Sequence, residues 1–232
     1  MQMCYDKKRK TVRTKSGREK TPMERESNYE KVFATFRKWF VESNQEKTAK
    51  KLGLRMDDDW LYLPFFNEPC MVNRKNGTIV SEKGQPVSVT DRLTIMHHLH
   101  YYQEAAADST KKIPFREIRE AAVFEHAYIK SAVEPLVKAF SGCPEKLLQS
   151  GIAMGGRKEK YGDVSVTLQA FPKISLTYIF WDADEEFPAS ANILFDDQIA
   201  RWTHPESVPV LAQTGTERLI EQAFGEKLQK RI

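Results

Sequence analysis

The sequence lacks several features that would place it at once in a large class of proteins. No apolar run approaches the roughly 18 to 20 residues that a helix needs to span a bilayer, and the charged N-terminus has no apolar stretch like that of a secretory signal. The three cysteines, Cys4, Cys70 and Cys143, are odd in number and include no CxxC pair, so they predict neither a disulfide framework nor a metal-binding motif. We therefore expect a cytoplasmic protein with reduced thiols and no membrane association.

Motifs for nucleotide binding and for hydrolysis are also missing. There is no glycine-rich phosphate loop, no HExxH zinc motif and no GxSxG nucleophile motif, and the expected strands and helices do not alternate as in βαβ units. At 232 residues, with 41% hydrophobic and 29% charged residues, the chain has the composition of a globular protein and can bury a core without disulfides or metals. Disorder throughout is excluded, and a nucleotide-binding fold is disfavoured.

Positive charge gathers at one end of the chain. Residues 1–20 contain eight Lys or Arg and two acidic residues, a net charge of +6, and since the whole chain carries +4, the remaining 212 residues carry −2. A basic arm can neutralise nucleic-acid phosphates. This one has Tyr5 as its single aromatic residue and precedes a slightly acidic domain, which favours a solvated terminus over a nucleic-acid partner. We expect a basic, disordered tail over residues 1–26 and one folded domain over residues 27–232.

The first half of that domain shows helix and hairpin signals. Ser27 and Glu30 form a capping box that predicts the start of a helix, which Gly53 can end. Two apolar runs follow at 60–66 and 70–72, and the Asn-Gly pair at 76–77 supplies the positive φ angles of a tight hairpin turn. These signals predict a small antiparallel unit.

A second helix begins near Ser88, where Asp91 completes a pattern similar to a capping box. His97 and His100 lie three residues apart and can share a face of this helix, whereas His98 points elsewhere. No metal motif accompanies them, and hydrogen-bonded histidines are the simpler interpretation.

Strand periodicity dominates the second half of the domain. Helical sequence runs from about residue 121 to 140, with a new segment or a kink expected at Glu134-Pro135. From residue 163 the apolar period changes to two, in two runs at 164–168 and 174–180 that flank a turn at Pro172-Lys173. We predict an α+β fold with one mostly antiparallel sheet built from hairpins and covered by helices.

Carboxylates are crowded where the second long strand ends. Four of the five residues from 182 to 186 are acidic, and Trp181 and Phe187 flank them. Like charges so close repel each other, and a cation, an arginine or shared protons can offset the repulsion. If the strand continued, Asp182, Asp184 and Glu186 would share one face and suit a hard cation. The alternative is a solvated acidic turn in which one carboxylate caps the next helix.

Several short segments between residue 27 and the C-terminus stand out together. They are 28–31 (NYEK), 96–102 (MHHLHYY), 114–117 (PFRE), 135–140 (PLVKAF), 155–156 (GG), 181–188 (WDADEEFP) and 192–196 (NILFD). In these segments, and most specifically in the acidic one, the chain resembles the domain-of-unknown-function family 3786, which is found mainly in anaerobic bacteria and archaea. The resemblance implies a link to anaerobic cofactor, corrinoid or one-carbon metabolism. Some members place an iron–sulfur cysteine cluster ahead of the domain, whereas this chain has Cys4 among lysines and arginines there.

Three hypotheses for the function follow. The first is a small-molecule or cofactor-binding domain with a pocket between sheet and helices, where convergent polar groups lie among aromatic rings. The residues expected to line it are His98, Phe115, Arg116, His126, Tyr128, Trp181, Asp182, Asp184, Glu185 and Glu186. The second is an enzyme in which the carboxylates of 182–186 hold a divalent cation or act as general acid and base. The third is an interaction module whose basic tail engages nucleic acid or an acidic partner. None of these patterns assigns a particular cofactor or metal.

Overall fold

The computed structural model describes residues 22–84 and 86–225. They form helices and two antiparallel sheets, of four and five strands, so the predicted α+β class is confirmed, but the prediction of a single sheet is wrong. Within these residues, no helix has the length and apolar character needed to cross a membrane. The basic segment of residues 1–20, with Cys4, lies outside the described residues.

Two helices and the four-stranded sheet come first along the chain. The helices are α1 (Pro22–Glu42) and α2 (Gln45–Leu52), and the strands, in the order in which they pair, are β1 (Arg55–Met56), β2 (Trp60–Phe65), β3 (Glu68–Asn73) and β4 (Ile79–Ser81). Gly77 has a positive φ of 67°, but Asn76 does not. Residues 74–78 connect β3 to β4, so the tight turn predicted at Asn-Gly is not formed, although the two strands pair antiparallel. The small antiparallel unit expected from the sequence is therefore present.

The first helix differs from the prediction at both ends. It begins at Pro22, so Ser27 lies within the helix and is not its N-cap. It also ends at Glu42, and a second helix starts after Asn44, whose side chain accepts a hydrogen bond from the Lys47 amide at 2.9 Å. Gly53, with a φ of 69°, ends this second helix.

The central part of the chain is helical with irregular turns. Helix α3 (Val89–Tyr101) is capped by Ser88, whose hydroxyl accepts from the Asp91 amide as predicted. After β5 (Lys112–Pro114) come two 3-10 turns (Phe115–Glu117 and Arg119–Phe124), α4 (Glu125–Tyr128), a π-helical turn (Ile129–Val133) and α5 (Glu134–Phe140). Pro135 has no amide hydrogen to donate within the helix. Just before Pro135 the helix widens into the π turn, in which the Glu134 amide donates to the Ile129 carbonyl. Of the two alternatives expected at Glu134-Pro135, a new helical segment or a kink, the structure has a new segment, α5, which follows the π turn.

The five-stranded sheet follows α6 (Pro144–Ala153). Its strands are β6 (Arg157–Lys158), β7 (Val164–Phe171), β8 (Ile174–Trp181) and β9 (Ser190–Asp196), which pair with β5 in the order β5-β9-β8-β7-β6. The turn at Pro172-Lys173 connects β7 to β8 as predicted. The chain ends with α7 (Ile199–Trp202) and α8 (Ser207–Phe224).

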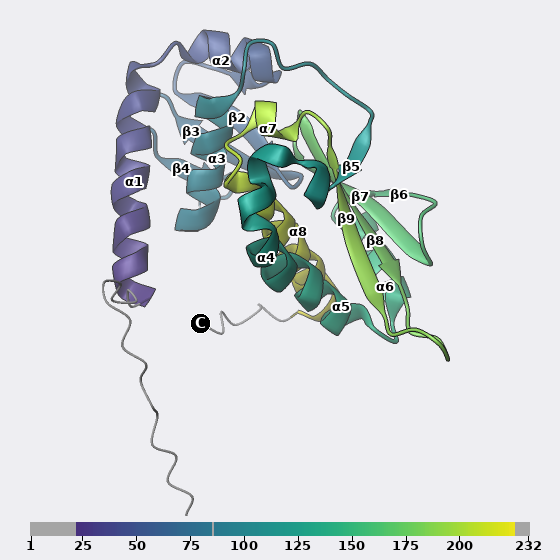
Figure 1. Cartoon of the computed structure of the whole chain (residues 1–232). Coiled ribbons are helices and arrows are strands. Elements are labelled where there is room, and N and C mark those ends of the chain that lie inside the picture. The colour runs from purple at the N-terminus through teal and green to yellow at the C-terminus, as the bar shows by residue number, and fades with distance from the viewer. Residues whose placement is uncertain (1–21, 85, 226–232) are drawn as a thin grey trace, which may run out of the picture.

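Helices α5, α6 and α8 contact the five-stranded sheet, whereas α1 and α2 lie beside the four-stranded sheet (Figure 1), and the two sheets contact each other through β2 and β7. A Cβ on Gly151 of α6 would lie only 2.5 Å from Val166 Cγ2, so a glycine allows α6 to approach β7 closely. On the same face, the Tyr178 hydroxyl donates to the Ala212 carbonyl of α8. The turn between β2 and β3 reaches the other sheet, where the Phe66 amide donates to the Ala170 carbonyl at 3.0 Å.

A buried ion pair fastens the edge strand β5. Lys112 Nζ lies 2.5 Å from Asp196 Oδ1, and their side chains are only 17% and 9% exposed. Asp196 also accepts from the Ser175 amide, and Lys112 donates to the Ser175 hydroxyl. One lysine and one carboxylate thus connect three strands, and each would be an uncompensated buried charge without the other.

Replacing Asp196 with Ala should lower the free energy of unfolding by roughly 3 kcal/mol, because the Lys112 ammonium would lose its buried counter-ion. Urea denaturation followed by circular dichroism measures this loss. The matched control is Glu134→Gln, which breaks the exposed Lys130–Glu134 pair and should cost at most about 0.5 kcal/mol. Equal losses in the two variants would show that Asp196 has no special structural role.

Candidate functional site

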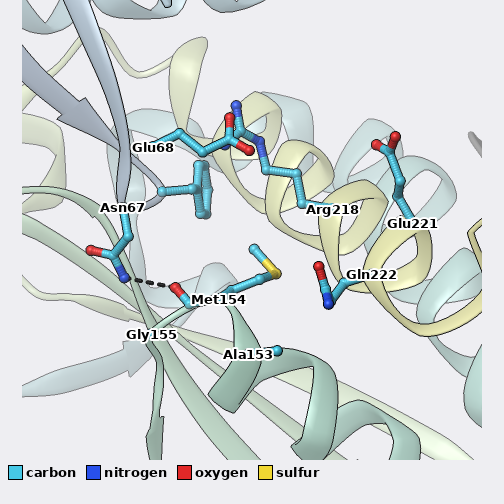
Figure 2. A pocket seen from close by; sticks show the side chains of 9 residues that line it. Asn67, Glu68, Ala153, Met154, Gly155, Arg218, Glu221 and Gln222 are labelled. Carbon is cyan, nitrogen blue, oxygen red and sulfur yellow. Dashed lines mark hydrogen bonds and ion pairs between the residues drawn. The ribbon is translucent and has the colours of Figure 1, made fainter. Parts of the chain in front are cut away.

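A groove of about 730 Å³ lies where the β2–β3 turn, the end of α6 and the last turns of α8 come together (Figure 2). The turn supplies Phe66 and Asn67, and β3 supplies Glu68. The other lining residues are Ala153, Met154 and Gly155 from the end of α6, and Arg218, Glu221 and Gln222 from α8. Three elements that are distant in the sequence therefore form one concave surface.

The wall of the groove contains a strained turn. Phe66 and Asn67 have φ angles of 50° and 60°, the pattern of a type I′ turn, which glycine and asparagine adopt far more readily than phenylalanine. The Phe66 ring is 3% exposed, and space for it exists because residue 215 on α8 is glycine: a Cβ there would lie 2.9 Å from the ring and would overlap the Tyr178 hydroxyl. Packing thus holds a backbone conformation that costs on the order of 1–3 kcal/mol.

Asn67 ties the turn to the end of α6. Its side-chain amide donates to the Met154 carbonyl at 2.8 Å, which satisfies a carbonyl just past the last turn of the helix. Gly155 has a φ of 76°, and a Cβ on it would lie 2.9 Å from the Asn67 amide nitrogen. The approach of the turn to α6 therefore depends on glycine at position 155.

Arg218 occupies the upper end of the groove, and its charge is already engaged. Its guanidinium donates to the Phe65 carbonyl at 3.1 Å and to the Glu68 carboxylate at 2.8 Å. It lies 4.9 Å from the centre of the Phe65 ring, and a second nitrogen is 3.8 Å from an Asp91 oxygen. Its side chain is only 18% exposed, so Arg218 contributes mainly to holding the turn in place.

Two polar side chains on α8 are open to the groove. Within the described residues, neither the Glu221 carboxylate nor the Gln222 amide has a hydrogen bond or ion pair, and both residues are exposed. Figure 2 shows the side chains of Gln222 and Met154 extending toward one another across the floor. These groups are available to a molecule that enters.

Some of the residues that the sequence singled out lie in the core. Phe115 and Tyr128 stack at 4.3 Å between ring centres, and burial raises the pKa of the Tyr128 phenol. His98 is fully buried, stacks on Phe171 at 4.2 Å and lies 2.8 Å through Nδ1 from the Trp202 carbonyl. As expected, His97 and His100 share a different face, where both contact Phe36. None of His98, Phe115 and Tyr128 lines the groove.

The remaining predicted residues are exposed. Arg116 and His126 lie at the surface, and Arg116 makes no ion pair within the described part of the chain. Trp181 ends β8 and is 40% exposed, and Asp184, Glu185 and Glu186 follow it in an exposed loop. The structure therefore does not bring the ten predicted residues together around one cavity.

In the acidic loop, backbone amides donate hydrogen bonds to two of the four carboxylates, those of Asp182 and Asp184. Since β8 ends at Trp181, the strand does not continue through the acidic residues, and the condition for Asp182, Asp184 and Glu186 to share a strand face is not met. Asp182 accepts from the amides of Gly142 and Ala183, both at 2.9 Å. Hydrogen bonds from the amides of Phe187 and Glu186 lower the pKa of Asp184. Throughout the described residues, no three His, Cys, Asp or Glu side chains are grouped so as to hold a metal ion.

The Gly155-Gly156 pair stood out in the sequence but was not assigned to a site. Phe66, Asn67, Met154 and Glu221 were missed. One local signal was present, because the apolar runs at 60–66 and 70–72 are separated by only three residues that begin with Asn67, and a short polar gap of this kind indicates a turn. That α6 and α8 meet at this turn depends on long-range packing, which no local pattern encodes.

These observations define a two-sheet α+β protein with a groove beside the turn that joins the sheets. The family model "Domain of unknown function (DUF3786)" matches residues 44–218, and the chain belongs to this family, as its sequence predicted. The match includes both sheets, the strained turn, α6 and Arg218, whereas α1 precedes it and Glu221 and Gln222 follow it. No curated protein and no solved structure matches the chain.

Burial of His98 has a consequence for pH. Desolvation lowers the pKa of His98 to about 4, and within the described residues its Nε2 has no partner. The folded state therefore favours the neutral ring, whereas the unfolded chain protonates near pH 6.5. This contribution to stability is fully present above pH 6.5 and is lost as the pH falls toward 4.

The free energy of unfolding should fall by about 2 kcal/mol between pH 7.5 and pH 5 through His98 alone. Urea unfolding at the two pH values measures the fall. The His98→Phe variant keeps an aromatic ring beside Phe171. It should be less stable than the wild type at pH 7.5, because the Trp202 carbonyl loses its partner. Its free energy of unfolding should, however, fall by about 2 kcal/mol less than that of the wild type between pH 7.5 and pH 5. An identical fall in both proteins would rule out His98 as its source.

Proposed function

We propose that the protein binds a small organic molecule in the groove formed by the β2–β3 turn, α6 and α8. The observation that carries the proposal is the combination of a hollow of about 730 Å³ with the apolar Met154 and Phe66 and with Glu221 and Gln222, whose side chains have no partner among residues 22–84 and 86–225. This volume lies within the range of about 300–1,000 Å³ that is usual for small-molecule sites. A few polar groups among apolar surface fix the orientation of such a ligand.

The strained turn supports this proposal. Backbone strain persists where surrounding contacts enforce it, and it clusters at ligand sites and active sites. Here the strain falls on Phe66, and two of the contacts that maintain it, the Asn67 amide on the Met154 carbonyl and Arg218 on the Phe65 carbonyl, also shape the groove. In this proposal the turn is the rigid wall against which the ligand packs.

Each open side chain has a distinct part in binding. The Met154 thioether is flexible and polarisable and adapts to an apolar part of the ligand. The Gln222 amide offers both a donor and an acceptor, and the Glu221 carboxylate accepts hydrogen bonds. No described group in the groove has the arrangement of a nucleophile beside a base, so binding is the proposal and not catalysis.

The other hypotheses have less support. Metal-dependent catalysis by the carboxylates of residues 182–186 is not favoured, because backbone amides already satisfy Asp182 and Asp184. An interaction through the basic arm concerns residues outside the described part of the chain. A cytoplasmic location and a ligand from anaerobic cofactor, corrinoid or one-carbon metabolism stay predictions from the sequence.

Binding can be tested through the Met154 methyl group. The protein is labelled with ¹³C at the methionine methyls and titrated with a set of amines, carboxylic acids, nucleosides, folates and cobinamide. At least one compound should shift the Met154 signal in a saturable way, whereas the signal from buried Met96 should not move. The Ala153→Trp variant should abolish the shift, because an indole at this exposed lining position fills the groove.

The matched control is Ile152→Trp. Ile152 is the neighbouring residue on α6, is 48% exposed and does not line the groove, so this variant should bind as the wild type does. The proposal fails if no compound moves the Met154 signal, or if the shift survives in Ala153→Trp.

A further inference from the structure

We infer that the ligand of this groove is an organic cation, a primary amine or a guanidinium compound with an apolar body. The inference rests on the proposed function and adds the charge of the ligand. It comes from the balance of charged side chains around the groove, from the direction of two helices, and from the position of the apolar surface.

Negative charge exceeds positive charge in the groove. Glu68 and Glu221 are the acidic lining residues, and among the described residues that line it Arg218 has the one positive charge. The Arg218 guanidinium is engaged by Glu68 at 2.8 Å and has Asp91 at 3.8 Å. Its charge is thus neutralised within the protein, and the Glu221 carboxylate remains without a counter-ion in the described residues. An anionic ligand would have to displace Glu68 from Arg218, whereas a cation can bind Glu221 directly.

Two helices add to this negative character. The end of α6 supplies Ala153 and Met154 to the groove, and the last two turns of α8 supply Glu221 and Gln222. The last turns of both helices therefore lie beside the groove, and the dipole of a helix places partial negative charge at its C-terminal end. Protonated amines and guanidinium groups are the ligands that such ends favour.

The neighbouring surface indicates which way the cation points. A smaller hollow of about 230 Å³ adjoins the groove through Ala153 and Gln222, and its wall includes Lys146. The Lys146 ammonium lies 4.7 Å from the centre of the Phe224 ring. A second cation is disfavoured beside Lys146, so the charged end of the ligand belongs at Glu221, with its apolar body against Met154.

Titration with matched probes tests the charge of the ligand. Butylamine and butylguanidine serve as cations with an apolar body, 1-butanol as the neutral analogue and pentanoate as the anion. We expect the two cations to shift the Met154 methyl signal in a saturable way, with no shift from the alcohol or the carboxylate at the same concentrations. In Glu221→Gln, which keeps the shape of the side chain, the cations should bind about tenfold more weakly.

The control variant is Glu217→Gln. Glu217 lies one turn earlier on α8, accepts a hydrogen bond from Gln213 and does not line the groove, so its replacement removes the same charge from the same helix. It should leave the affinity unchanged. If Glu217→Gln weakens binding as much as Glu221→Gln, the amines bind the general surface charge and the inference is wrong.

The same titration separates failure of this inference from failure of the proposed function. If 1-butanol or pentanoate moves the Met154 signal with an affinity equal to that of butylamine, the groove binds small molecules but does not select a cation. If none of the probes, and none of the broader set of compounds, moves that signal, both the inference and the proposed function are wrong.

Discussion

The structure depends on the contact that the two-residue turn between β2 and β3 makes with the rest of the molecule. The Phe66 amide donates to the Ala170 carbonyl in the other sheet, and the Phe65 and Phe171 rings lie 5.0 Å apart across the same junction. Arg218 holds the turn from α8, and Asn67 holds it from α6. These contacts join the sheets, maintain an unfavourable backbone conformation and form the groove.

Local signals in the sequence located most elements of the fold. Ser88 caps a helix, and Pro172-Lys173 connects two long strands, because both depend on a few adjacent residues. The start of α1 was placed too late, since the pattern at Ser27 also occurs inside a helix that begins upstream at Pro22. The division of strands into two sheets was not predicted, because hairpin patterns specify neighbouring strands and not which hairpins join.

The candidate site was harder to predict than the fold. Crowded carboxylates imply a compensating partner, but the sequence does not show that amides such as those of Gly142 and Phe187 can be that partner. Histidine presents the same difficulty, because His98 turned out to be a neutral core residue. The groove itself joins residues more than 150 positions apart, such as Phe66 and Glu221, and only the tertiary structure brings them together.

In the proposed function, the strained turn also affects how the groove recognises its ligand. Its shape is set by backbone dihedral angles and by contacts to two helices and a strand, so this wall is preorganised before any ligand arrives. A rigid wall loses little conformational entropy on binding and excludes molecules of the wrong outline. The adaptable side chains of Met154 and Gln222 form the floor beside this wall, so in the proposed function selectivity by shape and tolerance of chemical variation belong to different parts of the same surface.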